Sequence, residues 1–255
     1  MLKFKNILRE MKTIYYQSFA NHRIKINLDK AIISFSFDDV PRSALINGVP
    51  LLDKYEIKSS FYVSAGLSEE QANNKETAYL NSDDIISLHN AGHHIACHTY
   101  SHYMLKNGNA NELAADAKKN VDRLQSMLGS TPIEHFSYPF GQVNLKEKKL
   151  LAKSYNTMRS SRPGINKSLA DMFLLRAISI YNPHFDTQVL TNVIQKTEQA
   201  GGWLVFYTHG VEENPDDFSC TPEQFKWILQ ACVKSSAEIL PVDLAYKKII
   251  AACVK

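Results

Sequence analysis

The pattern of apolar and polar positions predicts alternating strands and helices from about residue 30 onward. Short apolar runs, such as AIISFSF at 31–37 and WLVFY at 203–207, are typical of buried strands. The segments expected to be strands are 31–37, 59–63, 95–97, 135–138, 157–158, 173–180, 203–207 and 238–240. The segments expected to be helices are 43–55, 82–91 with Ser82 as its N-cap, 111–128, 145–153, 186–199, 222–233 and the residues after 240.

This alternation predicts an α/β fold with one main domain, over residues 26–255. Apolar strands separated by helices indicate parallel strands that the helices cover. No linker rich in proline or serine and no internal repeat divides the chain. We therefore expect a barrel or partial barrel, in which functional sites lie at the carboxyl ends of the strands.

Residues 1–25 form a separate basic segment. Over residues 2–17 the apolar positions recur at helical spacing while the basic ones fall on another face, which predicts an amphipathic helix and a short lead-in. Two interpretations stay open. The helix contacts an anionic membrane surface, or it closes one end of the domain core.

Charge and cysteine usage narrow the classes of partner and compartment. The net charge is +3 and residues 1–25 alone carry +5, so the rest of the chain is mildly acidic, which argues against nucleic acid as a partner. The four cysteines form no C-x-x-C pair, as expected of reduced thiols. Charged residues interrupt any apolar signal-peptide region near the N-terminus. We expect a cytoplasmic protein, with peripheral contact at the inner membrane face through residues 2–17.

Three groups of polar residues follow predicted strands. Asp38 and Asp39 end the first strand, where neighbouring side chains point in different directions, so one carboxylate can hold a metal while the other faces a water. His98 and His102 are four residues apart, which places them on one side of a helical turn and suits a divalent ion. His209 follows the strand at 203–207 and suits a general acid or base. Each group also fits an ordinary polar loop, but parallel packing would bring all three to one face.

A fourth segment, FSYPFG at 136–141, also follows a strand. Its proline and glycine predict a tight turn. In that turn the backbone N–H of Phe140 is able to point at a developing oxyanion.

The order of these motifs resembles the polysaccharide deacetylase family, which has the NodB-homology fold and is also called carbohydrate esterase family 4. The motifs are SFDD at 36–39, HTYSH at 98–102, SYPFG at 137–141 and THG at 208–210. The resemblance implies a distorted (β/α) barrel of about seven parallel strands. The roles it implies are Asp38 as general base, Asp39, His98 and His102 as metal ligands, His209 as general acid, and Tyr138 with the Phe140 N–H at the substrate and oxyanion site.

The chain departs from the family pattern in several places, including His94, which stands where many members have glutamate. Many members carry an arginine in the third motif that contacts the base carboxylate, and SYPFG has none. Arg159 or Arg162 is a candidate to replace it at the substrate site, and the alternative is that both are structural or surface residues. No Asp-Trp motif is found to orient His209, so the partner of that histidine stays open.

These observations lead to a functional expectation. We expect a metal-dependent hydrolase that uses one divalent ion, Zn²⁺ by its ligand set, to remove an N-acetyl or similar small N-acyl group from an amino sugar. Its place would be surface polysaccharide biosynthesis. Two alternatives stay open: a catalytically silent glycan- or metal-binding module on the same fold, and an amidase for a non-sugar C–N bond.

Overall fold

A computed structural model describes residues 22–70, 79–104 and 109–253 of the chain. The helix predicted at 2–17 lies outside the described residues. None of the described helices is long and apolar enough to cross a membrane.

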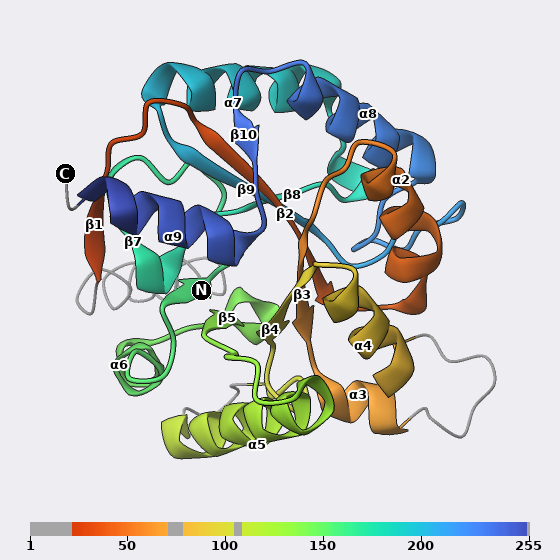
Figure 1. Cartoon of the computed structure of the whole chain (residues 1–255), viewed down its shortest axis with the longest axis vertical. Coiled ribbons are helices and arrows are strands. Elements are labelled where there is room, and N and C mark those ends of the chain that lie inside the picture. Colours follow the sequence, from red (N-terminus) through yellow and green to blue (C-terminus); the bar gives the residue numbers. More distant parts are fainter. Residues whose placement is uncertain (1–21, 71–78, 105–108, 254–255) are drawn as a thin grey trace, which may run out of the picture.

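The main sheet is a curled set of parallel strands that forms a half-barrel (Figure 1). Its strands are, in spatial order, β6 (Thr157–Arg159), β5 (His135–Ser137), β4 (His94–Cys97), β3 (Ser60–Val63), β2 (Ile32–Asp39), β9 (Trp203–Thr208) and β8 (Ile178–Ser179). A further strand, β10 (Glu238–Ile239), runs parallel to the start of β2. The prediction of a distorted (β/α) barrel with about seven parallel strands is confirmed.

Helices cover the outer face of this sheet (Figure 1). Alternate residues of β2, namely Ile33, Phe35 and Phe37, point outward and pack in one large apolar core with side chains of those helices. The outer helical elements are a π-helical turn (Ala44–Gly48) that runs into α2 (Val49–Asp53), then α3 (Ala65–Glu70), α4 (Ser82–Asn90), α5 (Ala110–Leu128), α6 (Leu145–Leu151), α7 (Thr187–Ala200) and α8 (Pro222–Val233). Three short 3₁₀ turns complete the helical elements, at Pro139–Gly141, Met172–Leu174 and Asn182–His184.

A second apolar cluster fills the amino end of the half-barrel interior. It packs Ile32 and Trp203 of the sheet against α9 (Val242–Cys253) and an antiparallel pair, β1 (Arg23–Ile26) with β7 (Ser168–Asp171). The β1–β7 pair was not predicted, because each strand has four residues and lacks an apolar run. With its amino end closed, the interior is left for polar side chains at the carboxyl end.

Two sequence-based expectations need correction. The strand expected over 173–180 is broken, because Leu175 pairs with Arg159 whereas Ile178–Ser179 pairs with β9, so the segment bends to close the gap between β6 and β8. The N-cap of α4 is Asn81 rather than Ser82. Asn81 exchanges hydrogen bonds with Asp84 in a capping box, because its side-chain oxygen accepts from the Asp84 N–H and the Asp84 carboxylate accepts from the Asn81 N–H.

Candidate active site

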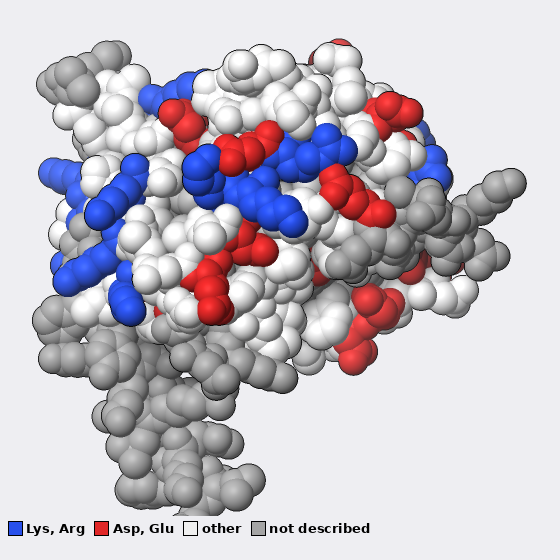
Figure 2. Space-filling model, turned by 90° about the horizontal axis from the view of Figure 1, so that it is seen from below, with Lys and Arg blue, Asp and Glu red and all other residues white. Residues whose placement is uncertain are grey.

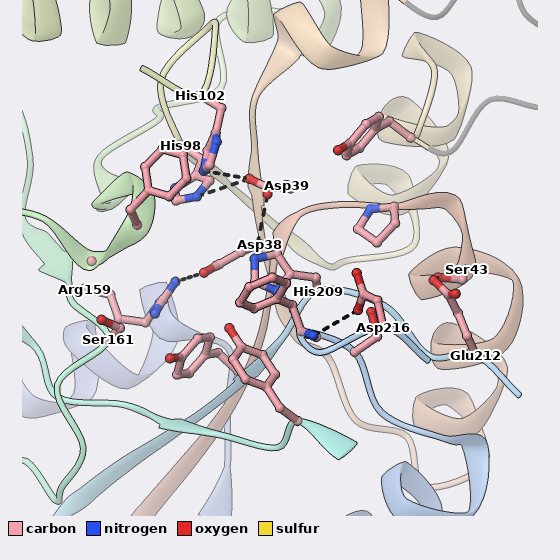
Figure 3. A pocket seen from close by; sticks show the side chains of 18 of the residues that line it. Asp38, Asp39, Ser43, His98, His102, Arg159, Ser161, His209, Glu212 and Asp216 are labelled. Atoms are coloured by element: carbon pink, nitrogen blue, oxygen red, sulfur yellow. Dashed lines mark hydrogen bonds and ion pairs between the residues drawn. The ribbon is translucent and has the colours of Figure 1, made fainter. Parts of the chain in front are cut away.

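The carboxyl ends of neighbouring parallel strands meet around a cavity of about 780 Å³. Strand register produces this meeting, since Asp39 pairs with Val63, Val63 with Cys97, and Cys97 with Phe136 along neighbouring strands. The predicted residues that line the cavity are Asp38, Asp39, His98, His102, Tyr138, Phe140, Arg159 and His209 (Figure 3).

Three side chains in this cavity form a group of potential metal ligands. Asp39, His98 and His102 each offer one atom, and these atoms lie within 4.8 Å of one another. The Oδ1 atom of Asp39 lies 3.3 Å from Nε2 of each histidine, yet it has no hydrogen-bond partner among the described residues although it is buried. A buried carboxylate oxygen between two imidazole nitrogens fits the donor set of a divalent cation.

His98 is held in one orientation by the neighbouring strand. Its Nδ1 atom lies 2.8 Å from the backbone oxygen of Ser137 and donates to it. This bond assigns the proton to Nδ1 and leaves the lone pair of Nε2 directed toward Asp39. The imidazole is therefore held in the orientation that a metal ligand would need.

The backbone at the end of β2 explains how two adjacent aspartates share one cavity. In a regular strand Asp38 would point into the half-barrel and Asp39 away from it. Instead Asp39 and Val40 have φ angles of 57° and 61°, in the left-handed region that is costly for side chains other than glycine. This turn brings the Asp39 carboxylate to the same side as Asp38. Backbone strain of this kind concentrates at functional sites.

The two histidines meet, but not on a helical turn as the spacing predicted. Their rings lie 5.1 Å apart in an irregular loop where Thr99 and His102 have φ angles of 63° and 50°. Asp116 of α5 holds the loop, because its carboxylate accepts from the backbone N–H groups of Tyr100 and Ser101 at 2.7 and 3.0 Å. Sequence reasoning missed Asp116, since nothing in the sequence signals this contact with the histidine loop.

Asp38 is paired with Arg159. The guanidinium donates to Oδ2 of Asp38, and both side chains are almost fully buried. Burial alone would raise the pKa of Asp38, but the charge of Arg159, aided by His98 and His209, outweighs it and lowers the pKa below its usual value. Asp38 is therefore ionised at neutral pH.

The position of Arg159 separates the two arginine candidates. Arg159 also donates to Ser137 Oγ, and its guanidinium carbon lies 4.5 and 5.2 Å from the ring centres of Tyr207 and Tyr62. It thus reaches the Asp38 carboxylate from β6 instead of from the third motif. Arg162 does not line this cavity but a second one.

His209 has a backbone partner in place of the missing acidic motif. Its Nδ1 atom lies 3.0 Å from the carbonyl oxygen of Phe218, and its Nε2 atom lies 3.7 Å from Oδ2 of Asp39. The ring also stacks on Tyr181 at 5.6 Å. Sequence reasoning could not find this partner, because a carbonyl carries no residue signature.

The SYPFG turn lies beside the histidines. Tyr138 is buried and its hydroxyl donates to the Phe173 carbonyl at 3.3 Å, so its ring forms a wall of the cavity. Phe140 has a φ of 58°, and its ring lies 4.4 Å from that of His102. The turn therefore borders the potential metal ligands.

A sequence model of the family described as polysaccharide deacetylase matches residues 25–158. The chain belongs to the polysaccharide deacetylase family. The match includes both aspartates and both loop histidines, whereas Arg159 and His209 lie beyond it. Family membership supports a deacetylase reaction on an acetylated carbohydrate.

Solved structures share this fold. A putative polysaccharide deacetylase from Mycobacterium smegmatis is 16% identical, with a TM-score of 0.65 over 90% of this chain and 94% of that one. A family 4 acetyl xylan esterase from Clostridium thermocellum, in complex with a cobalt ion, is 18% identical, with a TM-score of 0.59 over 85% and 91%. The deacetylase PplD of Streptococcus pyogenes, in complex with acetate, is 22% identical, with a TM-score of 0.50 over 57% of this chain and 62% of that one. This chain thus covers about three fifths of PplD.

The same fold also occurs in a protein without activity. BA3943, a family 4 pseudoenzyme from Bacillus anthracis, is 12% identical, with a TM-score of 0.61 over 88% of this chain and 68% of that one. No curated protein matches this chain. At such identities the structural comparisons establish the fold, and the chemistry is argued from the side chains.

Proposed function

We propose that this chain is a divalent-metal-dependent deacetylase that removes an N-acetyl or similar small N-acyl group from an amino sugar. The observation that carries the proposal is the meeting of Asp39, His98 and His102 beside Asp38, whose carboxylate is paired with Arg159. Three metal ligands, an ionised carboxylate and a nearby histidine are groups that metal-assisted amide hydrolysis can use.

In this proposal Asp39, His98 and His102 hold the metal ion. When bound, the ion polarises the acyl carbonyl and lowers the pKa of a water molecule. Two imidazoles and one carboxylate suit Zn²⁺, although other divalent ions accept the same ligands. The cobalt ion in the Clostridium thermocellum esterase supports a divalent ion in this fold.

Asp38 takes a proton from the attacking water. Its Oδ2 atom is engaged by Arg159, whereas its buried Oδ1 atom has no hydrogen-bond partner among the described residues and is free to accept. The backbone N–H of Phe140 donates to the oxygen of the acyl group as negative charge develops there. A positioned base contributes about 10²–10⁴ in rate and an oxyanion donor about 10²–10³.

His209 donates a proton to the leaving nitrogen as the C–N bond breaks. Because Nδ1–H donates to the Phe218 carbonyl, Nε2 is the atom that carries the transferable proton. Nε2 lies 3.7 Å from Oδ2 of Asp39, so it faces the proposed metal ligands. The products are a carboxylate and a free amine.

The walls of the cavity support a sugar as the substrate. Phe140 and Phe218 line it and are 49% and 56% exposed, unusually high for phenylalanine. The Tyr181 ring lies 5.7 Å from that of Phe218 and 5.6 Å from that of His209. Flat aromatic faces open to solvent suit the apolar face of a pyranose ring. Polar groups of Glu212 and Asp216 on the same wall supply acceptors for hydroxyl groups.

We further propose that the substrate is an intracellular precursor of a surface polysaccharide, handled at the inner membrane face. Cys97, Cys220 and Cys232 are free and buried, as in proteins of a reducing compartment. The basic sequence at 2–17 suits anionic lipid. Flotation with anionic liposomes tests this, and equal binding of the full chain and a variant lacking residues 1–17 contradicts it.

The second candidate function is a binding module without turnover. It is supported by the similar fold of BA3943, a family 4 pseudoenzyme. One experiment separates the two. Acetate release is measured from a panel of N-acetylated sugars after metal removal and after addition of Zn²⁺ or Co²⁺. Metal-dependent release supports the deacetylase. Bound metal without release from any sugar supports the binding module, and release only from non-sugar amides supports an amidase.

A further inference from the structure

A second cavity, of about 350 Å³, lies between the β1–β7 pair and the segment that follows β6. Its charged lining residues are Arg23, Arg162, Lys167 and Arg176, with Asp171 as the acidic member. On the side where Figure 1 places β1, β7 and α6, Figure 2 shows basic side chains gathered together, whereas both signs mix toward the middle of that face.

The positive charge of this cavity is not compensated. Over residues 22–70, 79–104 and 109–253, no carboxylate forms an ion pair with any of its four cations. Asp171 does not supply the missing charge, because its carboxylate pairs with the buried amine of Lys148. It also accepts from the backbone N–H groups of His22 and Phe173.

Arg176 is held in place by the segment that faces it. Its Nη1 atom donates to the Pro163 carbonyl at 3.0 Å, and the Asn166 side chain bonds its backbone N–H and carbonyl, each at 2.9 Å. Gly164 has a φ of 139°, and a Cβ atom there would lie 3.0 Å from Cδ of Arg176. A guanidinium fixed in this way loses little freedom when it binds a ligand.

The cations of this cavity act on one another. Burial lowers the pKa of Arg162, and the charge of Arg176 lowers it further. Burial also lowers the pKa of Lys148, against the effect of Asp171, and the charges of Arg23 and Arg162 add to the decrease. The fold therefore gathers like charges at one point, and a bound anion would relieve their repulsion.

We propose that this cavity binds a phosphate or diphosphate group. The four cations, which form no ion pair with a carboxylate of the described residues, exceed the charge of a single carboxylate, and guanidinium groups match the oxygens of phosphate in bidentate pairs. Ser161 lines the active-site cavity and the next residue, Arg162, lines this one. The group therefore belongs either to a free phosphate or to a phosphate-bearing amino sugar, and the second source rests on the proposed function.

Binding of inorganic pyrophosphate to the full chain, measured by titration calorimetry, tests the site without turnover. We expect saturable binding that weakens as salt is raised, and a loss of about tenfold or more in the variant Arg162→Ala/Arg176→Ala. The control is Lys226→Ala/Lys234→Ala, which removes the same charge from exposed positions at α8. No binding by the wild-type chain, or equal weakening in both variants, overturns the proposal. Thermal unfolding checks that both variants fold. The variant Arg176→Lys keeps the positive charge but loses the paired N–H donors of the guanidinium, so it should also bind pyrophosphate more weakly than the wild type.

A kinetic experiment distinguishes a phosphate group of the substrate from a free phosphate. Deacetylation of a nucleotide diphosphate amino sugar and of a neutral N-acetylated disaccharide is compared in the wild type and the double variant. A rise in KM for the charged substrate alone assigns the group to the substrate. If the double variant keeps the wild-type KM for both substrates while its binding of pyrophosphate is weakened, the site is assigned to free phosphate. The calorimetric test does not depend on turnover, so it tests the phosphate site even if the chain has no deacetylase activity.

Discussion

The guanidinium of Arg159 donates a hydrogen bond to the carboxylate of Asp38 across 121 positions of sequence. Both side chains are buried at the carboxyl end of the half-barrel. A buried charge that loses its partner is strongly destabilising, so neither residue is well accommodated there without the other. The pair couples the end of β6 to the end of β2 at the proposed general base.

Replacing Arg159 is expected to impair both catalysis and stability. In Arg159→Met the buried Asp38 carboxylate loses its compensating charge, so kcat should fall by about 10² or more, and unfolding free energy by about 3–5 kcal/mol. Arg159→Lys keeps the positive charge, so its losses in kcat and in unfolding free energy should be smaller. Steady-state kinetics and urea unfolding measure both effects. The control is Arg123→Met, which removes an exposed ion pair between α5 and Glu69 of α3, and a similar loss in that variant would contradict the assignment.

The variant Asp38→Asn is expected to bind metal but to lose nearly all turnover, and to fold with reduced stability because the buried Arg159 loses its charged partner. The amide is similar in size to the carboxylate but cannot accept the proton of water, which removes a contribution of about 10²–10⁴. Acetate release and elemental analysis on the same sample give both readings. Wild-type turnover in this variant would reject the proposed role of Asp38.

Metal removal is expected to abolish activity, and the support of the histidine loop should set metal affinity. Chelation removes the ion held by Asp39, His98 and His102, and added Zn²⁺ or Co²⁺ should restore turnover. Asp116→Ala frees the loop that carries His102, so metal affinity should fall by about 10–100-fold. Competition with a fluorescent chelator measures this. The control Asp122→Ala removes an exposed acid of the same helix, and equal loss in both variants would show that α5 acts only through its charge.

His209→Gln is expected to lower kcat most for substrates with poor leaving groups. The amine of an N-acetyl sugar needs a proton as it departs, whereas the phenolate of an aryl acetate does not. Turnover should therefore fall by about 10²–10⁴ on the sugar amide and far less on the aryl ester. Equal losses on both substrates would mean that His209 acts in binding or in folding.

Stability is expected to fall as the pH drops below about 6.5, owing to buried histidines beneath the site. Burial lowers the pKa of His94 to about 3, and burial, with His94 nearby, lowers that of His135 well below its usual value. Below pH 6.5 these histidines are protonated in the unfolded chain but stay neutral in the folded chain. Each of them therefore lowers the free energy of unfolding by about 1.4 kcal/mol per pH unit. Urea unfolding of the metal-free chain at several pH values measures this slope. His135→Asn should reduce this slope, whereas the control His184→Asn changes an exposed histidine and should not. An unchanged slope in His135→Asn would contradict the prediction.

The fold class followed from local patterns alone. Runs such as WLVFY at 203–207 are long and apolar enough to be buried on both faces, and Gly129 and Gly201 end their helices in the left-handed conformation, as expected of C-caps. The short strands β1 and β7 were not predicted, because each has only four residues, some of them exposed, and this pattern is too weak a signal in the sequence.

The motifs identified the polar residues of the site, because residue type and the ends of strands are written in the sequence. Tertiary structure decided the partners. Arg159 instead of Arg162 reaches Asp38, the Phe218 carbonyl holds His209, and Asp116 shapes the loop of the two histidines. The reason is physical: the sequence determines which segments form strands and which side chains end them, whereas strand register and left-handed turns decide where those side chains meet. A contact between residues more than a hundred positions apart, or with a backbone carbonyl, has no local signature and exists only once the sheet has curled.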